Sequence, residues 1–319
     1  DAQLSRGLGD VYKRQKYELQ LIKDLNVPAE KIIYGTAVKP SDHIKDFYEY
    51  GVRTFACDYE PELEKIAKHA PNSKVYFRLN VSNDGSKIDL SEKFGATRDE
   101  IISLVKRARE LDLDPHGISF HVGSDSSNVD SWANNLEVVN EIISEIKKHG
   151  IDLKIVNIGG GYPCGKYDCT PDQINIEDIA EKTLKKKDDL NLEQEIILEP
   201  GRGLIADTGV AVASIIGKAV RGDKKWLFLD MGVYNGLFQA TVGQEAKQFR
   251  VDTLKHSEEK DIFSLAGPTG DGPDVIRRDI ELPKDLDVGD VIIFYDIGAY
   301  NLPTVCNFHA LPKPNIHLI

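Results

Sequence analysis

Apolar positions along the chain follow two alternating patterns. Short apolar runs, typical of buried strands, are separated by segments whose apolar residues recur every three or four positions, as in amphipathic helices. The runs that we expect to form strands lie at residues 32–35, 53–56, 75–79, 117–122, 153–158 and 195–198. Helical spacing fills the intervals, for example at 43–50, 99–111 and 132–150. This alternation predicts βαβ units with parallel strands.

The pattern changes near residue 206. Beyond it, the strand-like runs VAVASIIGKAV, KKWLFLD, KDIFSLAG and DVIIFYD are joined by Asp-Gly and Gly-Asp turns. We therefore expect an α/β domain over 16–206 and a mainly β C-terminal domain over 207–319. Residues 1–15 show no clear period, and we interpret them as a foreign or disordered edge.

The number of predicted strands leaves two architectures open. A closed (β/α)₈ barrel needs eight strands, whereas an open doubly wound sheet can end at six. The first regular element after residue 16 is a helix with no strand before it. If the fold is a TIM-type barrel, we expect its first two strands to be missing from this chain.

Composition narrows the class of protein. The 319 residues are 41% hydrophobic and carry a net charge of −12, which is ordinary for a globular cytoplasmic protein and argues against nucleic acid as the main partner. No apolar run reaches the length of a membrane span, so we expect no membrane partner. The four cysteines match no zinc spacing, and we predict reduced thiols and no metal.

Candidate chemistry gathers where the predicted strands end. Each group has an ordinary explanation by itself: a glycine run can be a tight turn, a histidine a core residue, and Glu199 with Arg202 an ion pair. Together they indicate more, because bare glycine amides and Arg202 suit a phosphate, a carboxylate suits a cationic ring nitrogen, and an imidazole can stack on a flat ring. The groups are Arg78, His121, Gly159–Gly161, and Glu199 with Gly201 and Arg202. This combination describes pyridoxal 5′-phosphate.

Five motifs carry a resemblance to a known family. SFHVGS, NIGGGYP, EPGR, GPTGDGPD and GAY occur in the order and spacing of the fold-type III pyridoxal-phosphate-dependent decarboxylases for ornithine, lysine, diaminopimelate and arginine. The resemblance covers about residues 16–319 and is closest to bacterial ornithine/lysine decarboxylases. It implies an alanine-racemase-like α/β barrel followed by a β domain, and decarboxylation of ornithine or lysine to a diamine in polyamine biosynthesis. It also implies a homodimer with shared active sites.

The resemblance assigns roles to individual residues. His121 would stack on the cofactor ring, Glu199 would pair with its nitrogen, and Arg78 would lie near its phenolic oxygen. The phosphate would be bound by Ser124, Gly160, Gly161, Gly201, Arg202 and Tyr300. Asp271 would come from the partner subunit to meet the distal ammonium of the substrate, and Phe308 would line the same pocket. Lys93 would pair across the dimer with Asp274.

Two departures concern the reaction and the substrate. Gly270 stands where the family has a catalytic cysteine that helps direct a proton to the product, and glycine offers no donor. A decarboxylation-dependent transaminase, other chemistry on the same cofactor, or a non-catalytic regulatory relative are therefore alternatives. A related racemase is less suited, because GPTGD does not resemble its tyrosine site. Glu245 is the stand-in for an acidic residue that commonly helps to bind the distal amine.

A third departure concerns the lysine that carries the cofactor. The family places it on the first barrel strand, so we expect it upstream of this chain. The Ala-Val-Lys sequence ending at Lys39 imitates the family's lysine motif, but it follows the strand that maps to the third position. We therefore interpret Lys39 as a solvated loop lysine before Pro40.

Overall fold

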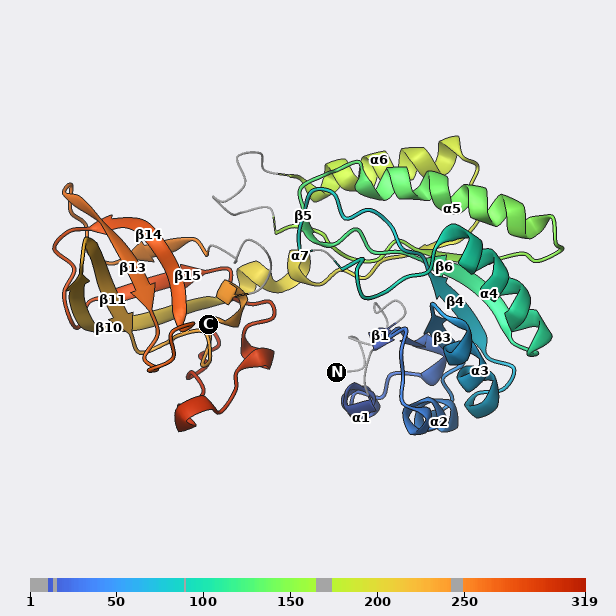
Figure 1. Cartoon of the computed structure of the whole chain (residues 1–319), viewed down its shortest axis with the longest axis horizontal. Coiled ribbons are helices and arrows are strands. Elements are labelled where there is room, and N and C mark those ends of the chain that lie inside the picture. Colours follow the sequence, from blue (N-terminus) through green and yellow to red (C-terminus); the bar gives the residue numbers. More distant parts are fainter. Residues whose placement is uncertain (1–10, 14–15, 89, 165–173, 242–248) are drawn as a thin grey trace. The chain divides into compact units, whose positions relative to one another are not determined.

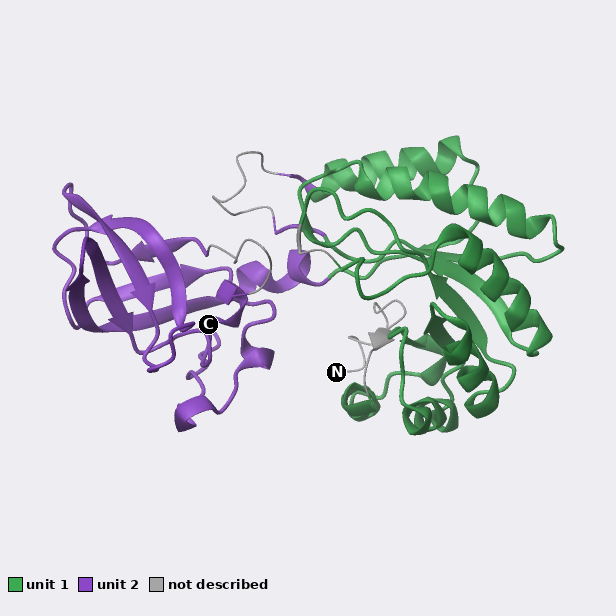
Figure 2. Ribbon diagram, in the orientation of Figure 1, with its two compact units in different colours: residues 1–161, 176–200 green, residues 162–175, 201–319 purple. Residues whose placement is uncertain are grey.

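The computed structural model describes residues 11–13, 16–88, 90–164, 174–241 and 249–319. The chain divides into two compact units, coloured separately in Figure 2. The first contains residues 1–161 and 176–200, and the second contains 162–175 and 201–319. Among the described residues, no helix is both long and apolar enough to cross a membrane.

The first unit is built on one curled sheet of seven strands, in the order β1-β2-β3-β4-β6-β8-β9. The strands are β1 (Val11–Lys13), β2 (Ile32–Tyr34), β3 (Thr54–Cys57), β4 (Lys74–Arg78), β6 (Asp114–Ser119), β8 (Ile155–Asn157) and β9 (Glu195–Ile197). All neighbouring pairs are parallel, as predicted. The sheet has one strand more than the six expected, because β1 pairs with β2 in a segment for which the sequence predicted no strand.

Helices cover the outer side of this sheet (Figure 1). They are α1 (Lys16–Asp24), α2 (Ser41–Tyr50), α3 (Glu60–His69), α4 (Arg98–Glu110), α5 (Ser131–Lys147) and α6 (Ile176–Asp189), with a short 3₁₀ turn at Ala29–Lys31. Local sequence sets several ends. Thr97 and Glu100 form a reciprocal capping box at the start of α4, and Gly51 ends α2 in a left-handed conformation with φ 113°.

A small ribbon accompanies the parallel sheet. It pairs β5 (Ser86–Ile88) with β7 (Ser124–Ser126) in antiparallel fashion. On one face of the main sheet, Ile33, Ala56, Tyr76 and Ile155 pack together from four different strands. Strands buried on both faces need continuous apolar runs, which explains why the sequence shows little alternation within them.

The second unit is mainly β, as predicted. Its six-stranded sheet has the order β12-β15-β10-β11-β13-β14 and is antiparallel except for the β11–β13 pair. The strands are β10 (Val210–Arg221), β11 (Lys224–Leu229), β12 (Val251–Thr253), β13 (Lys260–Ala266), β14 (Val275–Pro283) and β15 (Val291–Tyr295). Helix α7 (Arg202–Ile205) precedes them, and 3₁₀ turns lie at Ala206–Thr208, Phe238–Thr241, Leu302–Thr304 and Phe308–Ala310.

The core of the second unit lies against this sheet. Phe249, Phe263 and Phe294 are almost fully buried there with aliphatic residues from β10, β11 and β15. The first unit therefore supplies a parallel sheet with its strand ends at one edge, and the second supplies an independent β core.

Candidate active site

The carboxyl ends of four parallel strands carry candidate residues of the first unit. Arg78, Ser119, Asn157 and Ile197 are in register on β4, β6, β8 and β9. His121 and Glu199 each follow two residues after the end of their strand. The structure thus brings Arg78, His121 and Glu199 to one edge of one sheet, which is where enzymes with parallel barrel strands place their active sites.

The glycine turn after β8 packs too closely for any side chain. A Cβ atom at Gly159 would lie 2.2 Å from the carbonyl oxygen of Phe120, and one at Gly161 would lie 2.2 Å from that of Gly123. Both glycines also have positive φ, 67° and 95°. At Gly160, a Cβ would lie 2.5 Å from the carbonyl oxygen of Glu199. The turn is therefore a bare backbone surface, which is what close approach to a phosphate requires.

His121 lies beside this turn. The backbone N–H of Gly123 donates to its Nδ1 at 3.1 Å, so Nδ1 is unprotonated and a neutral ring carries its proton on Nε2. A Cβ at Gly160 would lie 3.2 Å from Nε2. Because Gly160 has no side chain, this residue does not cover the Nε2 side of the imidazole.

Ser124 and Arg78 flank the same edge. Ser124 begins β7, whose residue Ser126 donates its backbone N–H to the carbonyl oxygen of Gly161 at 3.0 Å. Arg78 is half-buried, with its guanidinium 5.1 Å from the ring centre of Phe94. Both residues lie where the sequence placed them, next to the strand ends, and their roles toward a cofactor stay predictions.

A polar residue that the sequence analysis missed joins the turn to Glu199. The side chain of Asn157 is fully buried, donates from Nδ2 to Glu199 Oε1 at 2.8 Å, and accepts at Oδ1 from the backbone N–H of Gly159 at 2.8 Å. The signal was present in the sequence, because an asparagine interrupts the apolar run KIVNI immediately before the glycines.

The second unit holds a buried arginine with unsatisfied donors. Arg202 is 5% exposed, and its Nη2 donates to Gln239 Oε1 at 2.8 Å. Its Nε and Nη1 are buried and have no hydrogen-bond partner in the described part of the chain. Unpaired buried guanidinium donors are unfavourable unless a ligand supplies acceptors. The side chain is therefore arranged for an anion.

Gly201 and Tyr300 lie next to this arginine. The guanidinium carbon of Arg202 is 5.1 Å from the ring centre of Tyr300, and a Cβ at Gly201 would lie 2.2 Å from the Tyr300 hydroxyl. Tyr300 has φ 60°, a left-handed conformation that is unusual for a tyrosine. The three residues that the sequence assigned to phosphate in this unit thus lie together.

These residues fit pyridoxal phosphate by the chemistry of their donors. A buried arginine with two unpaired nitrogens and a bare glycine turn suit a phosphate. A carboxylate held by a hydrogen bond, at Glu199, suits a protonated ring nitrogen, and the imidazole of His121 suits a planar ring.

A separate group in the second unit contains the residues assigned to the substrate. The hydroxyl of Tyr234 donates to Asp271 Oδ2, and this hydrogen bond raises the pKa of Tyr234 to about 12. The ring of Tyr234 lies 4.5 Å from that of Phe308, measured between centroids. Asp271 and Phe308, predicted to share a pocket, are thus joined through Tyr234, which the sequence analysis did not single out. Nothing lies within 4 Å of a Cβ at Gly270.

Asp274 holds the loop that carries Gly270 and Asp271. It is 2% exposed, and its carboxylate accepts from Val233 N at 2.9 Å, Thr269 N at 3.0 Å and Thr269 Oγ1 at 2.7 Å. These three donors satisfy the Asp274 carboxylate within the second unit. Pairing with Lys93 of a second subunit stays a prediction.

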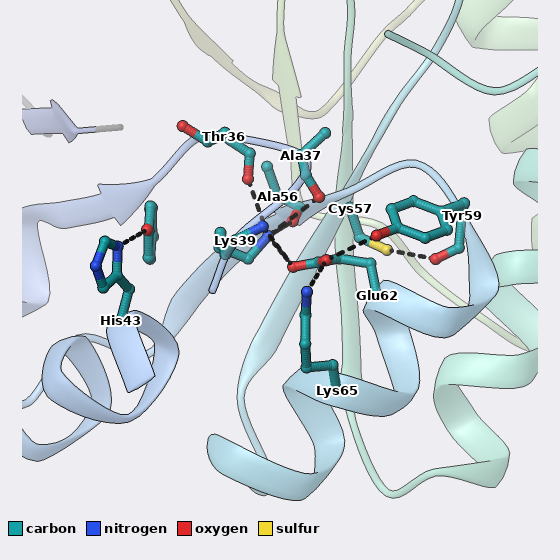
Figure 3. A network of polar contacts seen from close by, with 10 residues as sticks. Thr36, Ala37, Lys39, His43, Ala56, Cys57, Tyr59, Glu62 and Lys65 are labelled. Atoms are coloured by element: carbon teal, nitrogen blue, oxygen red, sulfur yellow. Dashed lines mark hydrogen bonds and ion pairs between the residues drawn. The ribbon is translucent and has the colours of Figure 1, made fainter. Parts of the chain in front are cut away.

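Lys39 contradicts the sequence analysis. It was expected to be solvated, but its side chain is fully buried and its Nζ lies 3.0 Å from Glu62 Oε1 (Figure 3). Nζ also donates to the carbonyl oxygens of Thr36, Ala37 and Ala56 at 2.9, 3.3 and 2.6 Å. The prediction was wrong because β3 and α3, distant in sequence, enclose the loop.

Burial dominates the electrostatics of this network. It lowers the pKa of Lys39 from its ordinary value, against the opposing charge of Glu62, and it raises the pKa of the Cys57 thiol to about 12. Glu62 also accepts from the Tyr59 hydroxyl at 3.1 Å and contacts Lys65 Nζ at 2.7 Å. Four acceptors surround Nζ, so Lys39 links the ends of β2 and β3 through hydrogen bonds. It is therefore poorly suited to carry a cofactor.

The remaining candidate, Glu245, lies outside the described residues, as does Cys169. Cys57, Cys164 and Cys306 are free thiols. The described residues contain no group of three or more histidine, cysteine or acidic side chains that could hold a metal ion.

Comparison with known proteins agrees with this chemistry. Residues 13–206 match the family described as "Pyridoxal-dependent decarboxylase, pyridoxal binding domain". The chain is 30% identical to the lysine/ornithine decarboxylase of Selenomonas ruminantium, over 92% of this chain and 73% of that protein. It is also 30% identical to antizyme inhibitor 2 of Xenopus laevis, over 95% of this chain and 69% of that protein.

The fold has equally clear relatives among solved structures. The lysine/ornithine decarboxylase of Vibrio vulnificus, complexed with cadaverine, matches with a TM-score of 0.86 and 27% identity, over 97% of this chain and 81% of that chain. The family match covers more than half of the chain and includes the strand-end residues from Arg78 to Glu199. The chain belongs to the pyridoxal-dependent decarboxylases.

Proposed function

We propose that the protein uses pyridoxal phosphate to decarboxylate a basic L-amino acid, ornithine or lysine, to the corresponding diamine. The observation that carries this proposal is the buried Arg202, whose Nε and Nη1 have no partner among the described residues, in a chain of this family. Pyridoxal phosphate, when bound, supplies an electron-withdrawing ring that accepts the electrons left behind when CO₂ departs.

The residues of the chain would divide the binding of this cofactor among them. Arg202, Gly201 and Tyr300 would bind the phosphate, together with Ser124, Gly160 and Gly161. Glu199 would keep the ring nitrogen protonated, His121 would support the ring face, and Arg78 would stabilise the phenolic oxygen. The polar groups are held by neighbours within their own units, so they need little rearrangement on binding.

Recognition of the substrate would depend on Asp271. The Asp271 carboxylate accepts a hydrogen bond from Tyr234, and the Tyr234 ring lies beside that of Phe308. This group offers one charge and one apolar ring surface, which suits an ammonium at the end of a methylene chain. Glu245 is proposed as a second acidic contact. Gly270 carries no proton donor, so we propose that water delivers the proton to the product at that position.

We also propose a cytoplasmic homodimer in which Asp271 enters the site of the partner subunit. The dimer is supported by the resemblance of the GPTGDGPD loop to that of the family. The net charge of −12 gives no reason to expect a nucleic-acid partner. Sedimentation velocity would show a dimer, and a monomer at micromolar concentration would refute this part.

The test is release of CO₂ from carboxyl-labelled ornithine, lysine, arginine and diaminopimelate by the full-length protein with added pyridoxal phosphate. We expect ornithine or lysine to be the best substrate and one diamine to form for each CO₂. An aldehyde product in place of diamine would indicate the transaminase alternative. Cofactor binding without CO₂ from any substrate would refute the proposal in favour of a non-catalytic relative.

A further inference from the structure

Asn157 occupies a position where a polar side chain is unfavourable by itself. It is the last residue of β8, its neighbours Ile155, Val156 and Ile158 are buried and apolar, and its own exposure is 0%. A buried primary amide is tolerated only when its donors and acceptor are paired. Its partners therefore indicate what the residue does.

Three hydrogen bonds connect Asn157, Gly159 and Glu199 in a closed ring. The backbone N–H of Gly159 donates to Asn157 Oδ1 at 2.8 Å, and Asn157 Nδ2 donates to Glu199 Oε1 at 2.8 Å. The backbone N–H of Glu199 then donates to the carbonyl oxygen of Gly159 at 2.9 Å. Because a backbone N–H can only donate, the amide orientation is fixed, and Nδ2 must face the Glu199 carboxylate.

We propose that Asn157 is a positioning residue that fixes the Glu199 carboxylate and the start of the glycine turn in one arrangement. This inference rests on the proposed function, in which Glu199 meets the ring nitrogen and the turn meets the phosphate. Its role is to make the two contacts mutually dependent: the same side chain sets the direction of one Glu199 oxygen and the path of the backbone at Gly159.

A purely structural role is the alternative explanation. The Glu199–Gly159 backbone hydrogen bond would remain without the asparagine, and the surrounding glycines are already constrained by close contacts. If Asn157 only stabilised the fold, its replacement would change the melting temperature without changing the protonation of a bound ring nitrogen. The two roles therefore differ in a property of the ligand.

The test uses pyridoxamine 5′-phosphate, which has the ring nitrogen and the phosphate but no aldehyde, so its binding does not require a covalent lysine. Dissociation constants would be measured by equilibrium dialysis of the full-length protein, and the protonation of the bound ring by ¹⁵N chemical shift with a ¹⁵N-labelled ring. Asn157→Leu removes both side-chain contacts, whereas Asn157→Asp keeps an acceptor for Gly159 and removes the donor to Glu199. Thr183→Val is the matched control, because it removes a buried α6 hydroxyl that donates to the carbonyl oxygen of Ile179 in the same helix.

We expect Asn157→Leu to weaken binding about 10- to 100-fold, on the scale of losing one hydrogen bond to a charged group. Asn157→Asp should instead raise the protonated fraction of the ring nitrogen, because it places a second negative charge beside Glu199 and an added negative charge favours the cationic ring. In a Glu199→Gln background, the effect of Asn157→Leu on ring protonation should disappear, since the residue acts through Glu199.

Several outcomes would overturn the inference. Unchanged affinity and ring protonation in both Asn157 variants would show a structural role, as would an equal loss in Thr183→Val. An effect on ring protonation that persists undiminished without Glu199 would show that Asn157 does not act through it. If the unaltered protein fails to bind pyridoxamine phosphate, the proposed function itself is wrong and the inference falls with it.

Discussion

Removal of one partner of the buried Lys39–Glu62 pair should destabilise the first unit strongly. Both side chains are fully buried, and their charged atoms are 3.0 Å apart. Breaking such a pair by replacing one member typically costs about 3–5 kcal/mol, because an uncompensated charge stays buried. Replacing both members with apolar residues of similar volume removes the charges together and is often much less harmful.

The contacts of each partner set the order of the effects. In Lys39→Met, Glu62 keeps the Tyr59 hydroxyl and Lys65, so we expect a loss of ~3 kcal/mol. In Glu62→Leu, the Lys39 ammonium keeps three carbonyl oxygens but loses its neighbouring carboxylate, so we expect the upper end, ~5 kcal/mol. The double variant should be more stable than Glu62→Leu alone.

Urea denaturation followed by tryptophan fluorescence measures these changes. The chain has two tryptophans, and Trp132 lies fully buried on α5 in the first unit. A Trp226→Phe background therefore makes the signal report on that unit. Lys65→Met is the control, because Lys65 contacts the same carboxylate from a partly exposed position and should contribute only ~1 kcal/mol or less. A loss below ~1 kcal/mol in Lys39→Met, or losses that simply add in the double variant, would refute the reasoning.

Four further predictions follow from other contacts. Gly270→Cys should fold normally, since nothing lies within 4 Å of its Cβ, and should raise the rate of diamine formation because it adds a proton donor; a lower melting temperature or an unchanged rate would contradict this. Tyr234→Phe removes the donor to Asp271 and should raise the KM for the diamino acid about tenfold with little change in kcat, and an unaltered KM would exclude a substrate role for this pair. Burial lowers the pKa of His116 below 6.5, so at slightly acidic pH the unfolded state binds more protons than the folded state. The free energy of unfolding should therefore fall as the pH drops from 7.5 to 5.5. Urea titrations should show a larger fall in the unaltered protein than in His116→Gln. Borohydride reduction of the cofactor-loaded protein, followed by peptide mass spectrometry, should leave Lys39 unlabelled. A label there would overturn its assignment as a structural residue paired with Glu62.

The sequence predicted the fold more completely than the site. Parallel strands and amphipathic helices follow from local periodicity, which is why β2, β3, β4, β8 and β9 lie within one or two residues of their expected positions. Strand β6 begins and ends three residues earlier than expected. Strand β1 was missed because three residues carry too little pattern to recognise. Glu199 and Arg202 were found because short motifs carry them.

Residues defined by long-range contacts could not be found in this way. Lys39 has the local sequence of an exposed loop, but its buried side chain contacts Ala56 and Glu62, which lie 17 and 23 positions away. Tyr234 becomes a candidate only through its hydrogen bond to Asp271, which lies 37 positions later. Asn157 was detectable in principle, since a polar residue inside an apolar strand has few explanations other than a specific partner.

The three hydrogen bonds that the Asp274 carboxylate accepts affect how the loop that carries Gly270 and Asp271 can change during evolution. Gly232 and Gly267 are confined by that carboxylate, because a Cβ at either would lie 2.3 Å from one of its oxygens. Gly270 and Gly272, which flank Asp271, have open space around their Cβ positions. Mutations at these two sites can therefore accumulate without moving Asp271. A lineage could exchange the residue at position 270, and with it the proposed route of the proton, while Asp271, the proposed partner of the substrate ammonium, stays in place.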